Sequence, residues 1–92
     1  MIVRISNEGQ YELDESDAQA LDELDNKAVD QCAAGDEERF RATFAQLLAL
    51  VRAHGRPIPD DELVPSDVIL PPADVSFEEA QAGFSGEGLI PG

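Results

Sequence analysis

The sequence predicts an α+β fold, and three observations lead to this prediction. The first 13 residues are rich in β-branched side chains around a short polar turn, which favours a β-hairpin. Two stretches, 16–34 and 36–54, carry apolar residues at helical spacing, and the short link between them favours an antiparallel αα-hairpin. From residue 56 onward, prolines interrupt the chain. We therefore expect a single domain over residues 1–92: an N-terminal β-hairpin packed on an antiparallel αα-hairpin, followed by an extended Pro-rich C-terminal arm with one short helix.

The predicted β-hairpin covers residues 1–13 and turns at an Asn-Glu-Gly segment. Val3 and Ile5 share one face of its first strand, because side chains alternate along a strand. Ile2 points the other way, beside Arg4, so the second face is not purely polar. A two-stranded hairpin is marginal in water, so this one needs a helix or a third strand against it.

The first predicted helix covers residues 16–34. Ser16 and Gln19 have the spacing of a capping box at its start. Its apolar side chains form a thin stripe: Leu21, Leu24, Ala28 and Cys32. Four carboxylates are expected on the remaining faces, away from this stripe: Asp22, Glu23, Asp25 and Asp30.

The second predicted helix, residues 36–54, has the strongest apolar periodicity in the chain. Asp36 is placed to cap its start, and Gly55 followed by Pro57 ends it. Five large side chains fall on one stripe: Phe40, Phe44, Leu47, Leu48 and Val51. Each is worth roughly 1.5–3 kcal/mol if buried. We expect these five, with Leu21 and Leu24 of the first helix, to form the core.

The C-terminal arm, residues 56–92, alternates between proline-containing and acidic segments. Residues 56–62 read as an acidic connector. Val68–Leu70 is predicted to add a short edge strand, since the flanking prolines forbid a central one. A short helix is predicted over residues 76–84, where Ser76 begins a second capping-box spacing.

The net charge of −14 arises from 20 Asp and Glu residues against six Lys and Arg residues. So acidic a surface repels phosphate backbones and anionic lipids, which argues against nucleic-acid binding and direct membrane binding. Both a salt-loving host and a high-GC host would account for this composition. The charge does not set the oligomeric state.

The compartment is predicted from what the sequence lacks. Cys32 is the single cysteine, which excludes an internal disulfide and fits a reducing compartment. No apolar run has the length of a signal peptide or of a membrane span. We expect a cytoplasmic protein.

Catalytic and metal-binding motifs are poorly supported. Cys32 and His54 would lie roughly 27 Å apart in a helical hairpin, too far for a nucleophile pair. One Cys and one His do not make a zinc site, and Asp60-Asp61-Glu62 lacks the spacing of a calcium loop. We therefore assign no catalytic residue, no metal ligand and no cofactor.

Apolar residues in the arm suggest a docking strip for a partner. Residues 68–72 and 89–91 carry more bulky side chains than solvated loops need. One interpretation is that both segments complete the core. The other is that part of them is read by a partner, and this hypothesis involves six residues: Val68, Ile69, Leu70, Pro71, Leu89 and Ile90.

The chain resembles the PspA-associated (PspAA) family, small proteins that accompany phage shock protein A. The resemblance rests on eight segments that occur in order along essentially the whole chain. They are MIVRI (1–5), EGQYEL (8–13), LDELDNK (21–27), AAGDEERF (33–40), DDELVPSD (60–67), VILPPAD (68–74), FEEA (77–80) and EGLIPG (87–92). None of them is a catalytic signature.

This resemblance implies a non-enzymatic accessory protein of the envelope-stress response. Its partner would be a PspA-like coiled-coil protein of the membrane-remodelling class, through which the chain would be recruited to the inner face of the membrane. Two alternatives from other classes stay open. One is a small-ligand or divalent-cation-sensing module that uses the acidic arm, and the other is a hydrolase with a carboxylate pair.

Overall fold

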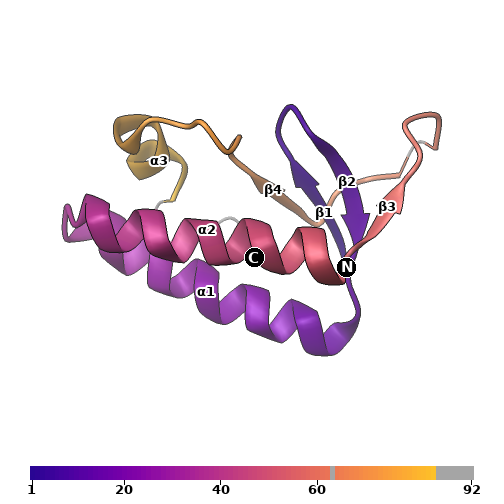
Figure 1. Ribbon diagram of the computed structural model, residues 1–92, viewed down its shortest axis with the longest axis horizontal. Helices are drawn as coiled ribbons and strands as arrows, with labels where there is room; N and C mark the ends of the chain where they lie inside the picture. The colour runs from indigo at the N-terminus through magenta and orange to yellow at the C-terminus, as the bar shows by residue number, and fades with distance from the viewer. Residues whose placement is uncertain (63, 85–92) are drawn as a thin grey trace.

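The fold is α+β, as the sequence predicts, with seven helices and strands in the part of the chain that the structure describes (Figure 1). The computed structural model describes residues 1–62 and 64–84. The strands are β1 (Ile2–Ile5), β2 (Gly9–Glu12), β3 (Arg56–Ile58) and β4 (Val68–Leu70). The helices are α1 (Glu15–Ala33), α2 (Glu37–His54) and α3 (Phe77–Gly83).

The four strands form one mixed sheet in the order β3-β2-β1-β4. β1 and β2 pair antiparallel, as do β2 and β3, whereas β4 lies parallel to β1. The short edge strand predicted over residues 68–70 is confirmed. The connector prediction for residues 56–62 was wrong at its start, because 56–58 pair with β2 as the opposite edge strand. Pro57 is tolerated there, since an edge strand does not need every N–H group for pairing.

The turn between β1 and β2 depends on one left-handed residue. Glu8 N–H donates to the carbonyl oxygen of Ile5 at 3.0 Å, which closes the turn. Asn7 inside it has φ 66°, a conformation that asparagine tolerates better than most residues. The hairpin therefore forms with asparagine in the position where glycine is the usual choice.

The link between α1 and α2 is a tight C-terminal cap followed at once by an N-terminal cap. Gly35 has φ 71° and donates to Cys32 O at 3.1 Å, and Asp36 N–H donates to Gln31 O at 3.0 Å. These two bonds make a Schellman motif, in which glycine avoids a Cβ penalty. The side chain of Asp36 then accepts from Arg39 N–H at 3.2 Å, so the predicted cap of α2 is confirmed.

The predicted cap of α1 was wrong. The helix begins at Glu15, with Asp14 as its N-cap residue and no side-chain capping bond. Leu13 is held by two backbone hydrogen bonds with Met1, of 2.8 and 3.1 Å, and the helix starts as soon as the chain leaves this contact. Ser16 is therefore already inside the first turn, where it cannot act as a cap.

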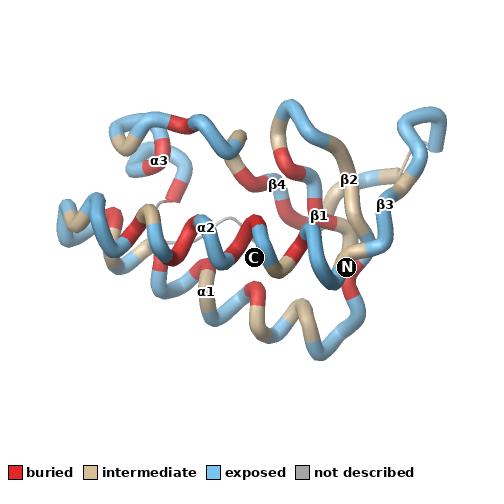
Figure 2. Tube along the Cα trace, viewed as in Figure 1, coloured by how far each residue is buried: buried red, intermediate tan, exposed pale blue. Residues whose placement is uncertain are grey.

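One core lies between the helical hairpin and one face of the sheet (Figure 2). Six of the residues expected in the core are buried: Leu21, Phe40, Phe44, Leu47, Leu48 and Val51. Leu24 is half-buried and packs at the margin of the core. The prediction that Asp25 lies away from the apolar stripe was wrong, because the buried stripe of α1 runs through Asp25 between Leu21 and Ala28.

The short helix α3 packs on the helical hairpin at the end that is farther from the sheet (Figure 1). Phe40 is the centre of this contact, with ring centroids 5.5, 5.7 and 5.4 Å from those of Phe44, Phe77 and Phe84. Ser76 caps α3 by accepting from the N–H of Glu79 at 3.1 Å, at the capping spacing that the sequence predicts. Aromatic packing therefore holds α3 and the residue that follows it, Phe84, against α2.

Candidate functional site

The structure separates the residues of the hypothetical docking strip. Val68 and Leu70 are 2% and 0% exposed and belong to the core, because they point toward the helices. Ile69 between them points to the opposite face and is 54% exposed, while Pro71 is half-buried. Leu89 and Ile90 lie outside the described residues. Of the segment 68–71, Ile69 is therefore the side chain most available to a partner.

Ile69 belongs to the outer face of the sheet, the face turned away from the core. Both long helices lie on the other side (Figure 1). The strand register places two rows of side chains on this outer face. One row crosses all four strands as Ile58, Gln10, Arg4 and Ile69, and the other contains Arg56, Glu12 and Ile2. The outer face thus mixes aliphatic and charged side chains.

The loop from β3 to β4 crosses this outer face and is fixed to it at Gln10. The Nε2 group of Gln10 donates to Val64 O at 3.0 Å and to Ser66 Oγ at 2.7 Å. At the far end of the loop, Ile2 N–H donates to Asp67 Oδ2 at 2.7 Å. The loop therefore leaves a hollow on its β3 side, and Arg4 and Ile69 open to solvent on its β4 side.

The hollow beside the loop has a volume of about 290 Å³. We call it the β3 hollow, and it is lined by Ile2, Glu12, Arg56, Pro57, Ile58, Pro59, Glu62 and Val64. Its lining combines aliphatic side chains with two carboxylates and one guanidinium group. Such a concave surface of mixed polarity is suited to binding one partner side chain that has both an apolar and a charged part.

The guanidinium group in the β3 hollow is already paired. Arg56 Nη2 lies 3.0 Å from Glu12 Oε1 and 3.2 Å from Asp14 Oδ1. The hydrogen bond to Glu12 raises the pKa of Arg56, so this side chain stays cationic. Glu62, in contrast, forms no ion pair with any residue in the described ranges 1–62 and 64–84. The carboxylate available to a partner in this hollow is therefore that of Glu62.

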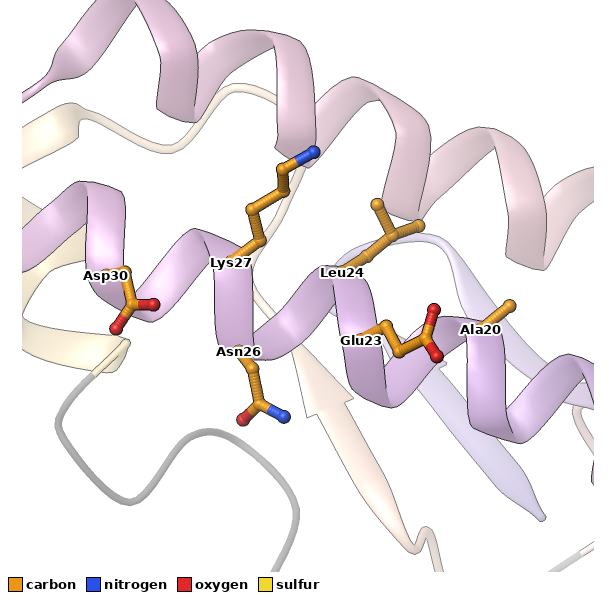
Figure 3. A pocket seen from close by; sticks show the side chains of 6 residues that line it. All are labelled: Ala20, Glu23, Leu24, Asn26, Lys27 and Asp30. Atoms are coloured by element: carbon orange, nitrogen blue, oxygen red, sulfur yellow. The ribbon is translucent and has the colours of Figure 1, made fainter.

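A second hollow, of about 530 Å³, lies on the surface of α1 (Figure 3). Its described lining residues all come from this one helix: Ala20, Glu23, Leu24, Asn26, Lys27 and Asp30. Leu24 and Lys27 point toward α2, whereas Asn26 points to the opposite side of α1. These side chains diverge around a single helix, so they do not converge on a common point as the groups of a catalytic site do.

Cys32 and His54 lie at opposite ends of the helical hairpin. Cys32 is buried near the α1–α2 link, and burial raises the pKa of its thiol, which favours the unreactive protonated form. His54 ends α2, and its Nδ1 lies 3.1 Å from Asp17 Oδ1 at the start of α1. The two side chains are thus engaged separately. Within the described part of the chain, no group of three or more His, Cys, Asp or Glu residues is arranged to hold a metal ion.

A comparison with known protein families identifies the family of this chain. The family model described as PspA-associated protein matches residues 1–92, the whole sequence. The chain belongs to the PspA-associated protein family. No curated protein and no solved structure matched it. The family name links this PspA-associated protein to the phage-shock system and points to PspA as its partner.

The lengths and compositions of the helices bear on whether one of them could span a membrane. Among the helices of the described residues, none combines the length and the apolar character that crossing a membrane requires.

The sequence predicts only part of the outer-face surface of this PspA-associated protein. The alternation in residues 2–5 places Ile2 opposite the core-facing Val3, as the structure confirms. Ile58 and Val64 carry no such signal, because the first follows a proline in a three-residue strand and the second lies in a loop.

Proposed function

We propose that this PspA-associated protein is a non-enzymatic accessory protein that binds a PspA-like coiled-coil protein of the membrane-remodelling class during the envelope-stress response. The observation that carries the proposal is the family match over residues 1–92. A match of this extent supports a role for the whole domain, rather than for one motif carried on an unrelated chain.

The physical character of the surface supports protein binding. The helices cover one face of the sheet and leave aliphatic and charged side chains on the other. The net charge of −14 disfavours direct contact with anionic lipid or with nucleic acid. Action at the cytoplasmic face of a membrane would therefore pass through the partner, and we place the protein in the cytoplasm.

Co-purification tests this proposal. The tagged protein is expressed in its own host and captured before and after an envelope stress, and the PspA-like protein is measured by immunoblot. We expect the PspA-like protein in the eluate, at a yield that falls in high salt because charge contributes to the contact. A matched tagged protein of similar net charge is the control. Equal recovery with that control would contradict specific binding.

A further inference from the structure

We propose that the β3 hollow receives a Lys or Arg side chain of the PspA-like partner, with its aliphatic stem on the hollow's apolar wall and its cationic group at Glu62. This inference rests on the proposed function, because it names the contact by which that partner is bound.

The shape and lining of the hollow fit the stem of a long basic side chain. Five of its eight described lining residues are aliphatic: Ile2, Pro57, Ile58, Pro59 and Val64. Lys and Arg bury their methylene stems along apolar surface and keep the charged group near water. A volume of about 290 Å³, open to solvent beside the loop, accommodates such a side chain better than it would enclose a free small molecule.

The charged groups around the β3 hollow favour a cationic group of the partner over an anionic one. Arg56 already donates to Glu12 and Asp14, and these two carboxylates offset its positive charge, so it attracts an incoming anion only weakly. Glu62 is exposed and makes no ion pair with another described residue. An incoming ammonium or guanidinium group would donate a charge-assisted hydrogen bond to this carboxylate.

The charge of the whole chain points the same way. At a net charge of −14, the protein attracts a basic partner surface and repels a second copy of itself. Ile69, which is 54% exposed on the same face, gives the partner an additional apolar contact beyond the loop. We therefore assign the hollow to a basic segment of the PspA-like protein rather than to self-association.

Binding measurements on charge and packing variants test the assignment. The purified PspA-like protein of the same organism is titrated into wild type, Glu62→Lys and Ile58→Ser, each checked for an unchanged fold by circular dichroism and thermal melting. We expect either change to weaken binding about tenfold or more. Glu38→Lys, which reverses an exposed charge on α2, and Val29→Ser, at a half-buried position on α1, are the matched controls and should bind like wild type.

Amide chemical-shift mapping of the same titration locates the contact even if a variant fails to fold. We expect the largest shifts at Ile2, Glu12, Ile58 and Val64. Strong wild-type binding with shifts confined to α1 and α2 would overturn the assignment and leave the proposed function intact. Equal weakening by Glu62→Lys and Glu38→Lys would also overturn it, because it would show a long-range charge effect.

Self-association is a separate outcome. If the wild-type protein forms a concentration-dependent dimer and Ile58→Ser abolishes it, the hollow binds a second copy of this chain, which would contradict the proposal. Absence of wild-type binding would refute the proposed function itself.

Discussion

Glu8 and Arg52 form a two-point ion pair that joins the β1–β2 turn to the last turn of α2. The Nε of Arg52 donates to Glu8 Oε2 at 2.9 Å, and its Nη2 donates to Oε1 at 2.5 Å. The hydroxyl of Tyr11 donates to the same carboxylate at 2.9 Å. Through these three bonds, Glu8 fixes the sheet to the end of the helix that carries most of the core.

This pair predicts a pH-dependent part of the stability. Hydrogen bonds from Arg52 lower the pKa of Glu8 below its ordinary value of 4.5. Folding therefore favours the ionised carboxylate, and its contribution is present above the unfolded pKa and is lost as the pH falls through the lowered folded pKa. Glu8→Gln should destabilise the protein at neutral pH, and the difference from wild type should shrink in acid.

Denaturant unfolding at a series of pH values from neutral to well below the ordinary carboxyl pKa of 4.5 checks this prediction, because the loss occurs between that value and the lowered folded pKa. Arg52→Gln is the companion variant, because it removes the other partner and should abolish the same pH dependence. A difference between wild type and Glu8→Gln that stays constant with pH would show that the ion pair contributes nothing through ionisation.

We predict that substitution to alanine lowers the folding stability by different amounts at two glycines. Gly35 has φ 71° and nothing within 4 Å of a built Cβ, so Gly35→Ala should cost only conformational strain, about 1 kcal/mol. At Gly55 the backbone is ordinary, but a Cβ would collide with Val51 O and lie 2.7 Å from Tyr11 Cβ. Gly55→Ala should therefore cost more, because backbone must move. Chemical denaturation of both variants decides this, and a neutral Gly55→Ala would show that α2 and β2 separate easily.

The aromatic cluster predicts a graded loss of stability. Phe40 is fully buried among three other Phe rings, so Phe40→Ala should cost about 3–5 kcal/mol. Phe77 is only partly buried, and Phe77→Ala should cost less. Thermal melting measures both. Similar melting temperatures for Phe40→Ala and wild type would contradict the role of this ring as the centre of the contact between α2 and α3.

Cys32 is predicted to react slowly in the folded protein. Its side chain is buried and burial raises the pKa of its thiol, so both access and the thiolate fraction are low. A thiol reagent should modify it slowly in native buffer and rapidly in denaturant. Rapid modification of the native protein would revive a nucleophilic or redox role for this residue.

The helical part of the fold is predictable because local periodicity determines it. The stripe of α2 has large apolar side chains at every turn, and Asp36 and Gly35 mark the boundary between the helices. β3 is not predictable in this way. It has only three residues with a proline at its centre, which gives the segment weak strand character, and it becomes a strand only because β2 offers a pairing edge distant in sequence. The burial of Asp25 is not predictable either, because a carboxylate occupies a buried position of an otherwise apolar stripe.

The candidate site was predictable only in part. Val68, Ile69 and Leu70 are three apolar residues in succession, and without alternation nothing in the sequence says which of them point inward. The β3 hollow combines Ile2, Ile58 and Val64, which the sheet and the crossing loop bring together from three separate segments. Such non-local assemblies follow from topology rather than from a local pattern.

Binding of the PspA-like protein is tested by isothermal titration calorimetry between the purified full-length protein and the PspA-like protein of its own host. We expect saturable binding, with an enthalpy that becomes more negative as temperature rises, because the aliphatic outer face would be buried. The titration is run at two temperatures so that a vanishing enthalpy at one of them is not mistaken for absence of binding. No heat at either temperature, together with separate elution of the two proteins in size-exclusion chromatography, would show that the two proteins do not bind each other.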